Sequence, residues 1–246
     1  MLVGTVKVRY QVNGRGEPLV LVHGLAGSTA WWVRNVGVFS QHYTVYLVDL
    51  PGFGAMRRYR KQFSVTGAVK WLGDFLNALN LERVSMIGHS MGGLIAGLFA
   101  ARWPYRLTKL VLAAPAIGLS NTAITAFLRP LAQEALSVSP RFAPTLAWDT
   151  ARAGISTLLR AARELLHMNI ERELAQIETP CLLVWGQRDL LVPVVLSSSL
   201  QAKIRNSRLY ILSGTGHLAM YDRAEQFNQA VLDFLAENRS CLTPRS

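Results

Sequence analysis

The sequence predicts an α/β fold with a mostly parallel sheet, and two observations predict it. Short apolar runs, too brief for a helix, alternate with longer segments whose apolar residues recur every three or four positions. The short runs are apolar at nearly every position, as parallel strands are when helices cover both faces. The chain has 246 residues, 50% of them hydrophobic and 17% charged, so it is long enough for a large core and its composition excludes a disordered protein.

The expected elements follow this pattern in order. An edge strand is expected at Thr5 to Val12, where apolar and basic side chains alternate with the two-residue period of a strand. Buried strands are expected at Leu19 to Val22, Val45 to Val48, Val84 to Ile87, Leu110 to Ala113, Cys181 to Trp185 and Arg208 to Leu212. Crossover helices are expected around Trp31 to Phe39, at Ser64 to Leu79 and at Met91 to Trp103.

The alternation of strand and helix breaks between residues 115 and 177. Strand-like runs vanish there, and helical pieces separated by prolines take their place. We therefore expect a helical cap at 115–177, inserted between two parts of one core at 1–114 and 178–246. An apolar stripe in this cap, which includes Ile155 and Leu159, is expected to pack against the core, with contact to substrate as the alternative.

The chain is strongly basic, with 26 lysines and arginines against 15 acidic residues and a formal net charge of +11. One dense basic run contains Arg57, Arg58, Arg60 and Lys61. No nucleic-acid-binding motif accompanies this run, so a solvated loop is the simpler interpretation. We expect no nucleic-acid partner and at most a weak contact of these four side chains with an anionic surface.

Several features favour a cytoplasmic protein. The two cysteines, Cys181 and Cys241, cannot form a disulfide framework, and Met1 to Tyr10 has no apolar export signal. Two long uncharged stretches, Val84 to Ala101 and Leu110 to Leu128, resemble membrane spans in length. Glycine and polar residues interrupt the first and a proline and a polar group the second, so each is better divided into a strand, a turn and the start of a helix.

One motif indicates nucleophilic chemistry. The run Gly88-His89-Ser90-Met91-Gly92 fits the pattern G-x-S-x-G, and it lies where an apolar strand ends and an apolar helix begins. A serine in so sharp a turn projects its hydroxyl clear of the sheet, and flanking glycines let the strand and the helix approach each other. The alternative is a serine that only caps the helix. We predict that Ser90 is a nucleophile, which then needs a base within hydrogen-bond reach.

His217 is the expected base among five histidines, because it lies in a glycine-containing loop after the last expected strand. The base in turn needs a carboxylate that fixes its tautomer. Asp189 follows the strand Cys181 to Trp185, at the strand end where open α/β sheets gather their sites. Asp222 is nearer in sequence, but with Glu225 it has the spacing of a helix capping box. We therefore expect the set Ser90, His217 and Asp189.

The same reasoning identifies an oxyanion site and a substrate pocket. Backbone N–H groups must point at the developing negative charge, and Met91 at the helix start and Leu25 in a loop of small residues are the expected donors. Trp31 and Trp32 near that loop, with Leu218 beside the base, are expected to line a largely apolar substrate pocket. This chemistry needs no metal ion and no cofactor.

The motifs together resemble the α/β-hydrolase family over essentially the whole chain. They occur in the family's order: His23-Gly24, then Asp49-Leu50-Pro51-Gly52-Phe53-Gly54, then Gly88 to Gly93, then Gly216-His217. The resemblance implies a mostly parallel eight-stranded sheet with flanking helices and an inserted helical cap. It also implies the roles given above for the nucleophile, base, orienting carboxylate and oxyanion donors, and a structural role for Asp49.

The resulting hypothesis is a serine hydrolase that cleaves small carboxylic esters with short to medium acyl chains through an acyl-enzyme on Ser90. One alternative is a carbon–carbon bond hydrolase of a dienoate, with Arg160 or Arg163 holding the carboxylate. Such enzymes typically carry asparagine before the nucleophile and tryptophan after the base, where this chain has His89 and Leu218. A further alternative is a small-molecule receptor with slow turnover. The sequence gives no oligomeric state.

Overall fold

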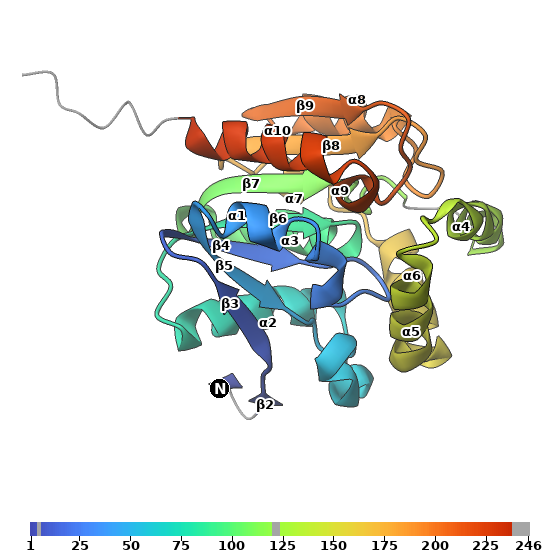
Figure 1. Ribbon diagram of the computed structural model, residues 1–246, viewed down its shortest axis with the longest axis horizontal. Coiled ribbons are helices and arrows are strands. Elements are labelled where there is room, and N and C mark those ends of the chain that lie inside the picture. Colours follow the sequence, from blue (N-terminus) through green and yellow to red (C-terminus); the bar gives the residue numbers. More distant parts are fainter. Residues whose placement is uncertain (4–5, 120–123, 238–246) are drawn as a thin grey trace, which may run out of the picture.

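The computed structural model describes residues 1–3, 6–119 and 124–237, with only the backbone for 6, 60–62, 124–128 and 171. Its centre is a seven-stranded sheet in the order β3-β5-β4-β6-β7-β8-β9 (Figure 1). Only β3 is antiparallel to its neighbour among these described strands. The strands are β3 (Tyr10–Asn13), β4 (Glu17–Val22), β5 (Tyr43–Val48), β6 (Val84–His89), β7 (Leu107–Ala113), β8 (Cys181–Gly186) and β9 (Ser207–Leu212).

The predicted α/β fold is confirmed, but the N-terminal edge differs from the prediction. The segment expected to be one strand is divided: β2 (Val6–Lys7) pairs with β1 (Leu2–Val3) in a separate two-stranded sheet, and β3 joins the main sheet. Val8 lies between the two, where its amide donates to the carbonyl of Met1 and its side chain is buried in the core. The main sheet therefore has seven described strands instead of eight, and Thr5 lies outside the described residues.

Two hydrophobic clusters cover the two faces of the sheet. Along β4, Val20 and Val22 belong to one cluster, whereas Leu19 and Leu21 belong to the other, and all four are fully buried. The first cluster includes residues of α2 (Val65–Ala78), α3 (Met91–Arg102) and α8 (Val195–Lys203), and the second includes residues of α1 (Val36–Phe39) and α10 (Ala224–Ala236). Helices on both faces explain why the strands are apolar at nearly every position.

Short helices connect these elements: η1 (Thr29–Trp32), η2 (Gly54–Gln62), η3 (Pro104–Arg106) and α9 (Ala219–Asp222). The basic run lies in η2, and its contact with an anionic surface stays a prediction. Asp222 is the last residue of α9, and the N-cap of α10 is Arg223, whose side chain makes no capping bond, so the expected capping box is not formed. In the described part of the chain, no helix has the length and apolar character needed to cross a membrane.

The described residues between β7 and β8 form helices and no strand. They are α4 (Ile124–Ser137), α5 (Ala143–Ala153), α6 (Ile155–His167) and α7 (Glu171–Leu174). Figure 1 shows α4, α5 and α6, here called the cap helices, grouped to one side of the sheet, toward the carboxyl end of β7. The division of the chain into a core and a cap at 115–177 stays a prediction.

The apolar stripe expected on α6 is partly wrong. Ile155 is 72% exposed and Leu159 is 42% exposed, whereas Thr157, Ala161 and Leu165 are buried. The buried residues of α6 therefore lie on a somewhat different side of the helix from the expected stripe, because contacts with the neighbouring helices decide which side is buried. Ile155 and Leu159 of α6 therefore lie at the surface, as do Leu131, Leu136 and Trp148 elsewhere in the cap helices.

The close packing of α3 against the carboxyl end of β4 generates a prediction about stability. A side chain at Gly92 would be driven into the carbonyl oxygens of Val22 and His23, which belong to rigid backbone. We expect Gly92→Ala to lower the free energy of unfolding by at least about 1–3 kcal/mol, measured by urea denaturation. Gly37→Ala is the matched control, because nothing lies within 4 Å of the added carbon in α1. Equal stability of the two variants would contradict the packing described for Gly92.

Candidate active site

Ser90 lies alone between β6 and α3, in a strained backbone conformation. Its φ is 52° and its ψ is −117°, a combination that non-glycine residues rarely adopt. Its amide donates to the carbonyl of Ala113 in β7 at 2.9 Å, so the turn is anchored to the neighbouring strand. The sequence thus folds as the G-x-S-x-G pattern predicts, with a single residue reversing the chain from strand to helix.

His217 and Asp189 form a buried hydrogen-bonded pair at the carboxyl ends of β8 and β9. His217 Nδ1 donates to Asp189 Oδ2 at 2.8 Å, and both side chains are almost wholly buried. The other oxygen, Oδ1, accepts from the amides of Leu191 and Val192, each at 2.9 Å, so the carboxylate has a fixed orientation. A proton held on Nδ1 leaves Nε2 of the neutral imidazole as a proton acceptor.

His89 joins this pair to the turn that carries Ser90. Its ring lies 4.8 Å from the ring of His217, centroid to centroid, and its Nε2 donates to the backbone carbonyl of His217 at 3.0 Å. His89 immediately precedes Ser90, so the loop at 213–217, here called the base loop, is held against the serine turn. Sequence reasoning considered His89 as one of five histidines and as the residue before the nucleophile, and missed this structural contact.

A second residue that sequence reasoning missed is Glu134 of α4. Its Oε1 accepts a hydrogen bond from the backbone amide of His217, and the residue is 6% exposed. Burial raises the pKa of the Glu134 carboxyl, against the opposing effect of the bond from His217. Nothing in the sequence around Glu134 distinguishes it from a solvated glutamate on a helix surface.

The loop after β4 lies close to Ser90, as expected for a source of oxyanion donors. A carbon added at Gly24 would lie 3.1 Å from Cβ of Ser90, and Leu25 is the next residue. Met91 is the first residue of α3, where amides have no acceptor within the helix. Within the described residues, no backbone acceptor is recorded for the amide of Leu25 or of Met91. Both amides remain the proposed oxyanion donors.

Asp49 and His23 make structural contacts around this loop. Asp49 accepts from the amides of Thr29 and Ala55, each at 2.7 Å, so it holds two loops together. His23 Nε2 accepts from the amide of Leu50 at 3.0 Å. Burial lowers the pKa of His23, which favours a neutral ring that can accept this hydrogen bond.

Asp149 of α5 connects a cap helix to the same loop region. Its Oδ2 accepts from the Ser28 hydroxyl at 2.7 Å and from the Trp31 indole at 3.1 Å. The Trp31 ring also lies 5.9 Å from the ring of His89. Burial raises the pKa of the Asp149 carboxyl, although the two hydrogen bonds favour its charged form.

The three residues expected to bind substrate are all buried. Trp31 is 4% exposed, Trp32 is 1% exposed and Leu218 is 6% exposed, and all three belong to the second hydrophobic cluster. Their contact with substrate stays a prediction, and for Trp32 its burial in the core counts against that role. Arg160 and Arg163 lie on the exposed side of α6, away from its buried face.

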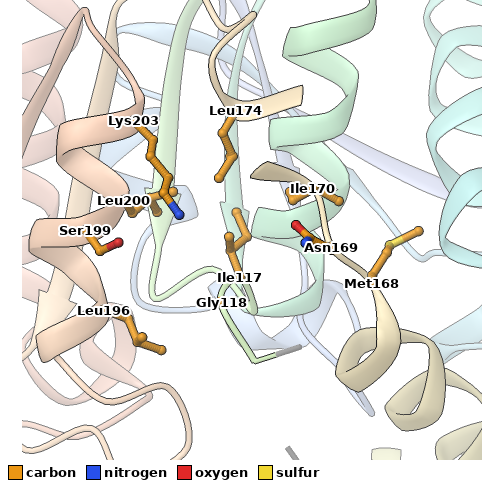
Figure 2. Close-up of a pocket in the computed structure, with 10 residues that line it drawn as sticks. All are labelled: Ile117, Gly118, Met168, Asn169, Ile170, Leu174, Leu196, Ser199, Leu200 and Lys203. Atoms are coloured by element: carbon orange, nitrogen blue, oxygen red, sulfur yellow. The ribbon is translucent and has the colours of Figure 1, made fainter. Parts of the chain in front are cut away.

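Ser90 lines neither of two cavities formed by the described residues. The smaller has a volume of about 40 Å³ and lies among residues of α7, α8 and the segment after β7, including Ile117, Leu174 and Lys203 (Figure 2). It has room for a few water molecules and is too small for an acyl chain. The larger, of about 770 Å³, borders Glu134, Gly216 and Arg188 beside the base loop. Ser90 itself is 9% exposed.

The pKa values of His217 and His89 are shifted by burial and by neighbouring charges. Burial disfavours the charged form of His217, but the charge and hydrogen bond of Asp189, with the charge of Glu134, outweigh it and raise the pKa of His217. Burial, followed by the nearby His217, holds the pKa of His89 well below its ordinary value. The pKa values of two adjacent imidazoles are therefore shifted in opposite directions, and the charged form is favoured at His217 and disfavoured at His89.

Comparison with known proteins agrees with this arrangement. The family model described as "Alpha/beta hydrolase family" matches residues 19–230, and the chain belongs to that family. The match extends from β4 to α10 and includes Ser90, Asp189 and His217. The protein is therefore an enzyme of the hydrolase class.

Individual relatives are similar over nearly the whole chain. The 2-hydroxy-6-oxo-6-phenylhexa-2,4-dienoate hydrolase of Comamonas testosteroni is 28% identical over 94% of this chain and 91% of its own length. The 2-hydroxy-6-oxononadienedioate/2-hydroxy-6-oxononatrienedioate hydrolase of Paraburkholderia phymatum is 30% identical over 94% of this chain and 92% of its own. A solved bacterial membrane phospholipase A has a TM-score of 0.82, at 25% identity over 96% of this chain and 84% of that one. Because these proteins carry names of different activities, family membership alone does not define the bond cleaved.

The raised pKa of His217 predicts the acid limb of the activity. As a base, His217 must be neutral, and it becomes protonated as the pH falls through its pKa. We expect kcat/KM for a p-nitrophenyl ester to fall on acidification with an inflection above the ordinary value of 6.5. The exposed His42 is the control, and His42→Gln should leave the inflection unchanged. An inflection at or below 6.5 would contradict the environment described for His217.

The buried contacts of Asp149 predict a loss of stability. Asp149→Ala leaves the Trp31 indole and the Ser28 hydroxyl without their acceptor, and we expect the free energy of unfolding to fall by about 1–3 kcal/mol. Asp149→Asn keeps an oxygen at this position and should lose less. Urea denaturation of the three proteins measures both differences, and an alanine variant as stable as the wild type would refute the contact's importance.

Proposed function

We propose that the protein is a serine hydrolase of small carboxylic esters that works through an acyl-enzyme on Ser90. The observation that carries this proposal is the buried hydrogen bond between His217 Nδ1 and Asp189 Oδ2, which His89 joins to the strained turn that holds Ser90. That bond keeps the proton on Nδ1 and leaves Nε2 free to accept one. A hydroxyl with such a base nearby becomes an effective nucleophile.

In the proposed mechanism, Ser90 Oγ attacks the carbonyl carbon of the ester while His217 Nε2 takes its proton. Asp189 stabilises the imidazolium that forms, and the amides of Leu25 and Met91 stabilise the negative oxygen of the tetrahedral intermediate. His217 returns the proton to the departing alcohol, which leaves an acyl group on Ser90. Water then repeats the sequence with the same base, and the acid is released.

Three observations favour an ester over a dienoate. His89 and Leu218 occupy the positions where carbon–carbon bond hydrolases typically carry asparagine and tryptophan, and both are buried. Arg160 and Arg163, the side chains expected to hold a dienoate carboxylate, lie on the exposed side of α6. The similarity to a solved phospholipase A also supports an ester substrate.

A second candidate function is hydrolysis of a carbon–carbon bond in a dienoate. It is favoured by the relatives from Comamonas testosteroni and Paraburkholderia phymatum, whose names give dienoate substrates. The same serine, base and carboxylate would serve this reaction. The two candidates differ in the substrate that the cap helices admit.

A substrate panel with a nucleophile variant tests the proposal. We expect wild-type protein to hydrolyse p-nitrophenyl esters in a series from acetate to palmitate, with a maximum at short or medium chains. Ser90→Ala should lower the rate by at least about 10⁴-fold while the circular dichroism spectrum is unchanged. Ser156→Ala, at an exposed position of α6, is the control and should retain full activity.

A ring-fission dienoate assayed beside the esters distinguishes the two candidates. Turnover of the dienoate with negligible ester hydrolysis would replace the first candidate by the second. Retained ester turnover in Ser90→Ala would refute the acyl-enzyme mechanism.

A further inference from the structure

The backbone of His217 is held from two sides by side chains. Its carbonyl accepts from His89, which belongs to the core, whereas its amide donates to Glu134, which belongs to the cap helix α4. The two contacts lie 128 and 83 residues away in sequence. The position of the base in the active site therefore depends in part on a cap helix.

Glu134 also contacts the loop that carries the orienting carboxylate. The backbone of Leu190, the residue after Asp189, also favours the charged form of the Glu134 carboxyl and so lowers its pKa. One buried carboxylate thus accepts from the amide of His217 and is favoured in its charged form by the backbone of Leu190, so it faces both loops whose side chains form the His217–Asp189 pair. Bonds from N–H groups to a charged acceptor are stronger than neutral ones, and a buried amide that loses its acceptor is destabilised.

We propose that Glu134 is a positioning residue for the reaction: it holds the base loop and the Asp189 loop in register so that His217 faces Ser90. This inference deepens the proposed function and rests on it, because it assigns to a cap helix a share in setting the geometry of the base. Glu134 does not touch the reacting atoms. It acts through the backbone of His217 and of Leu190.

The chain offers a matched comparison in Glu164 of α6. Glu164 Oε2 accepts from the amide of Val65 at 2.6 Å, so it also joins a cap helix to the core through a carboxylate and a backbone N–H. Val65 is the first residue of α2, which carries none of the proposed catalytic groups. If any lost contact between a cap helix and the core lowers activity, variants of Glu134 and of Glu164 should lose activity alike. If positioning of the base is what matters, only variants of Glu134 should lose activity.

The charge of Glu134 gives an independent signature. The groups that contact His217 are Asp189 after β8, His89 in β6 and Glu134 in α4, and Arg188, Asp222 and Arg223 line the cavity that borders Glu134. The negative charge of Glu134 favours the charged form of His217. Glu134→Gln keeps an oxygen acceptor but removes this charge, so the pKa of His217 should fall.

The kinetic test compares the wild type with Glu134→Ala, Glu134→Gln and Glu164→Ala, using p-nitrophenyl butyrate from pH 5 to 9. Melting temperatures are measured for all four. We expect Glu134→Ala to lower kcat by about 10- to 100-fold with KM changed less than about threefold, because the base is displaced. Glu134→Gln should recover most of kcat and move the acid limb to lower pH. Glu164→Ala should keep kcat within about threefold of wild type.

An equal loss of kcat in Glu134→Ala and Glu164→Ala at similar melting temperature would overturn the inference. The pKa of His217 provides a readout that needs no turnover, from an NMR titration of its imidazole assigned with His217→Asn. A lower pKa in Glu134→Gln supports the contact, and an unchanged value overturns it. If the wild type hydrolyses neither esters nor the dienoate while this pKa responds to Glu134→Gln, the proposed function fails and the positioning contact stands.

Discussion

The arrangement of the active site depends on the hydrogen bond between His217 and Asp189. Each side chain comes from a loop at the carboxyl end of a parallel strand, so the bond forms only when β8 and β9 lie in register. Burial by itself would disfavour a charged imidazole, and the carboxylate reverses that preference. The sheet thus supplies the alignment, and the buried pair converts it into a base with a defined tautomer. In the proposed mechanism, the hydroxyl of Ser90 becomes a nucleophile only in the presence of this pair.

The cap helices are joined to the core by carboxylates. Asp149 accepts from Ser28 and Trp31, Glu164 accepts from the amide of Val65, and Glu134 accepts from the amide of His217. Loops and helix starts in the core expose N–H and O–H donors, so acceptors on the cap are the complementary chemistry. Apolar packing gives little directional preference, whereas these bonds define where each cap helix lies on the core. The exposed Ile155 and Leu159 show that the apolar pattern of α6 alone did not define its orientation.

The sequence was most informative where structure is local. Apolar runs predicted the buried strands, and the glycines around Ser90 predicted a close approach of strand and helix, because both depend on neighbouring residues. The pairing of Asp189 with His217 could be expected from their positions at strand ends. The contacts of Glu134 and His89 with His217 could not be expected, since they join residues 83 and 128 positions apart in the sequence. Both contacts also involve backbone groups of His217, which carry no residue-specific signal. The N-terminal strand was misjudged because alternation does not reveal which sheet a strand joins.

One contact of the cap has an optical consequence. The Trp31 indole donates to Asp149 of α5 and lies against His89, so its surroundings belong partly to a cap helix and partly to the core. Indole emission moves to longer wavelength when water replaces protein around the ring. Separation of α5 from the core would hydrate Trp31 and change its emission, so a protein in which Trp31 is kept and the other five of the six tryptophans are replaced would report by fluorescence whether the cap helix contacts the core.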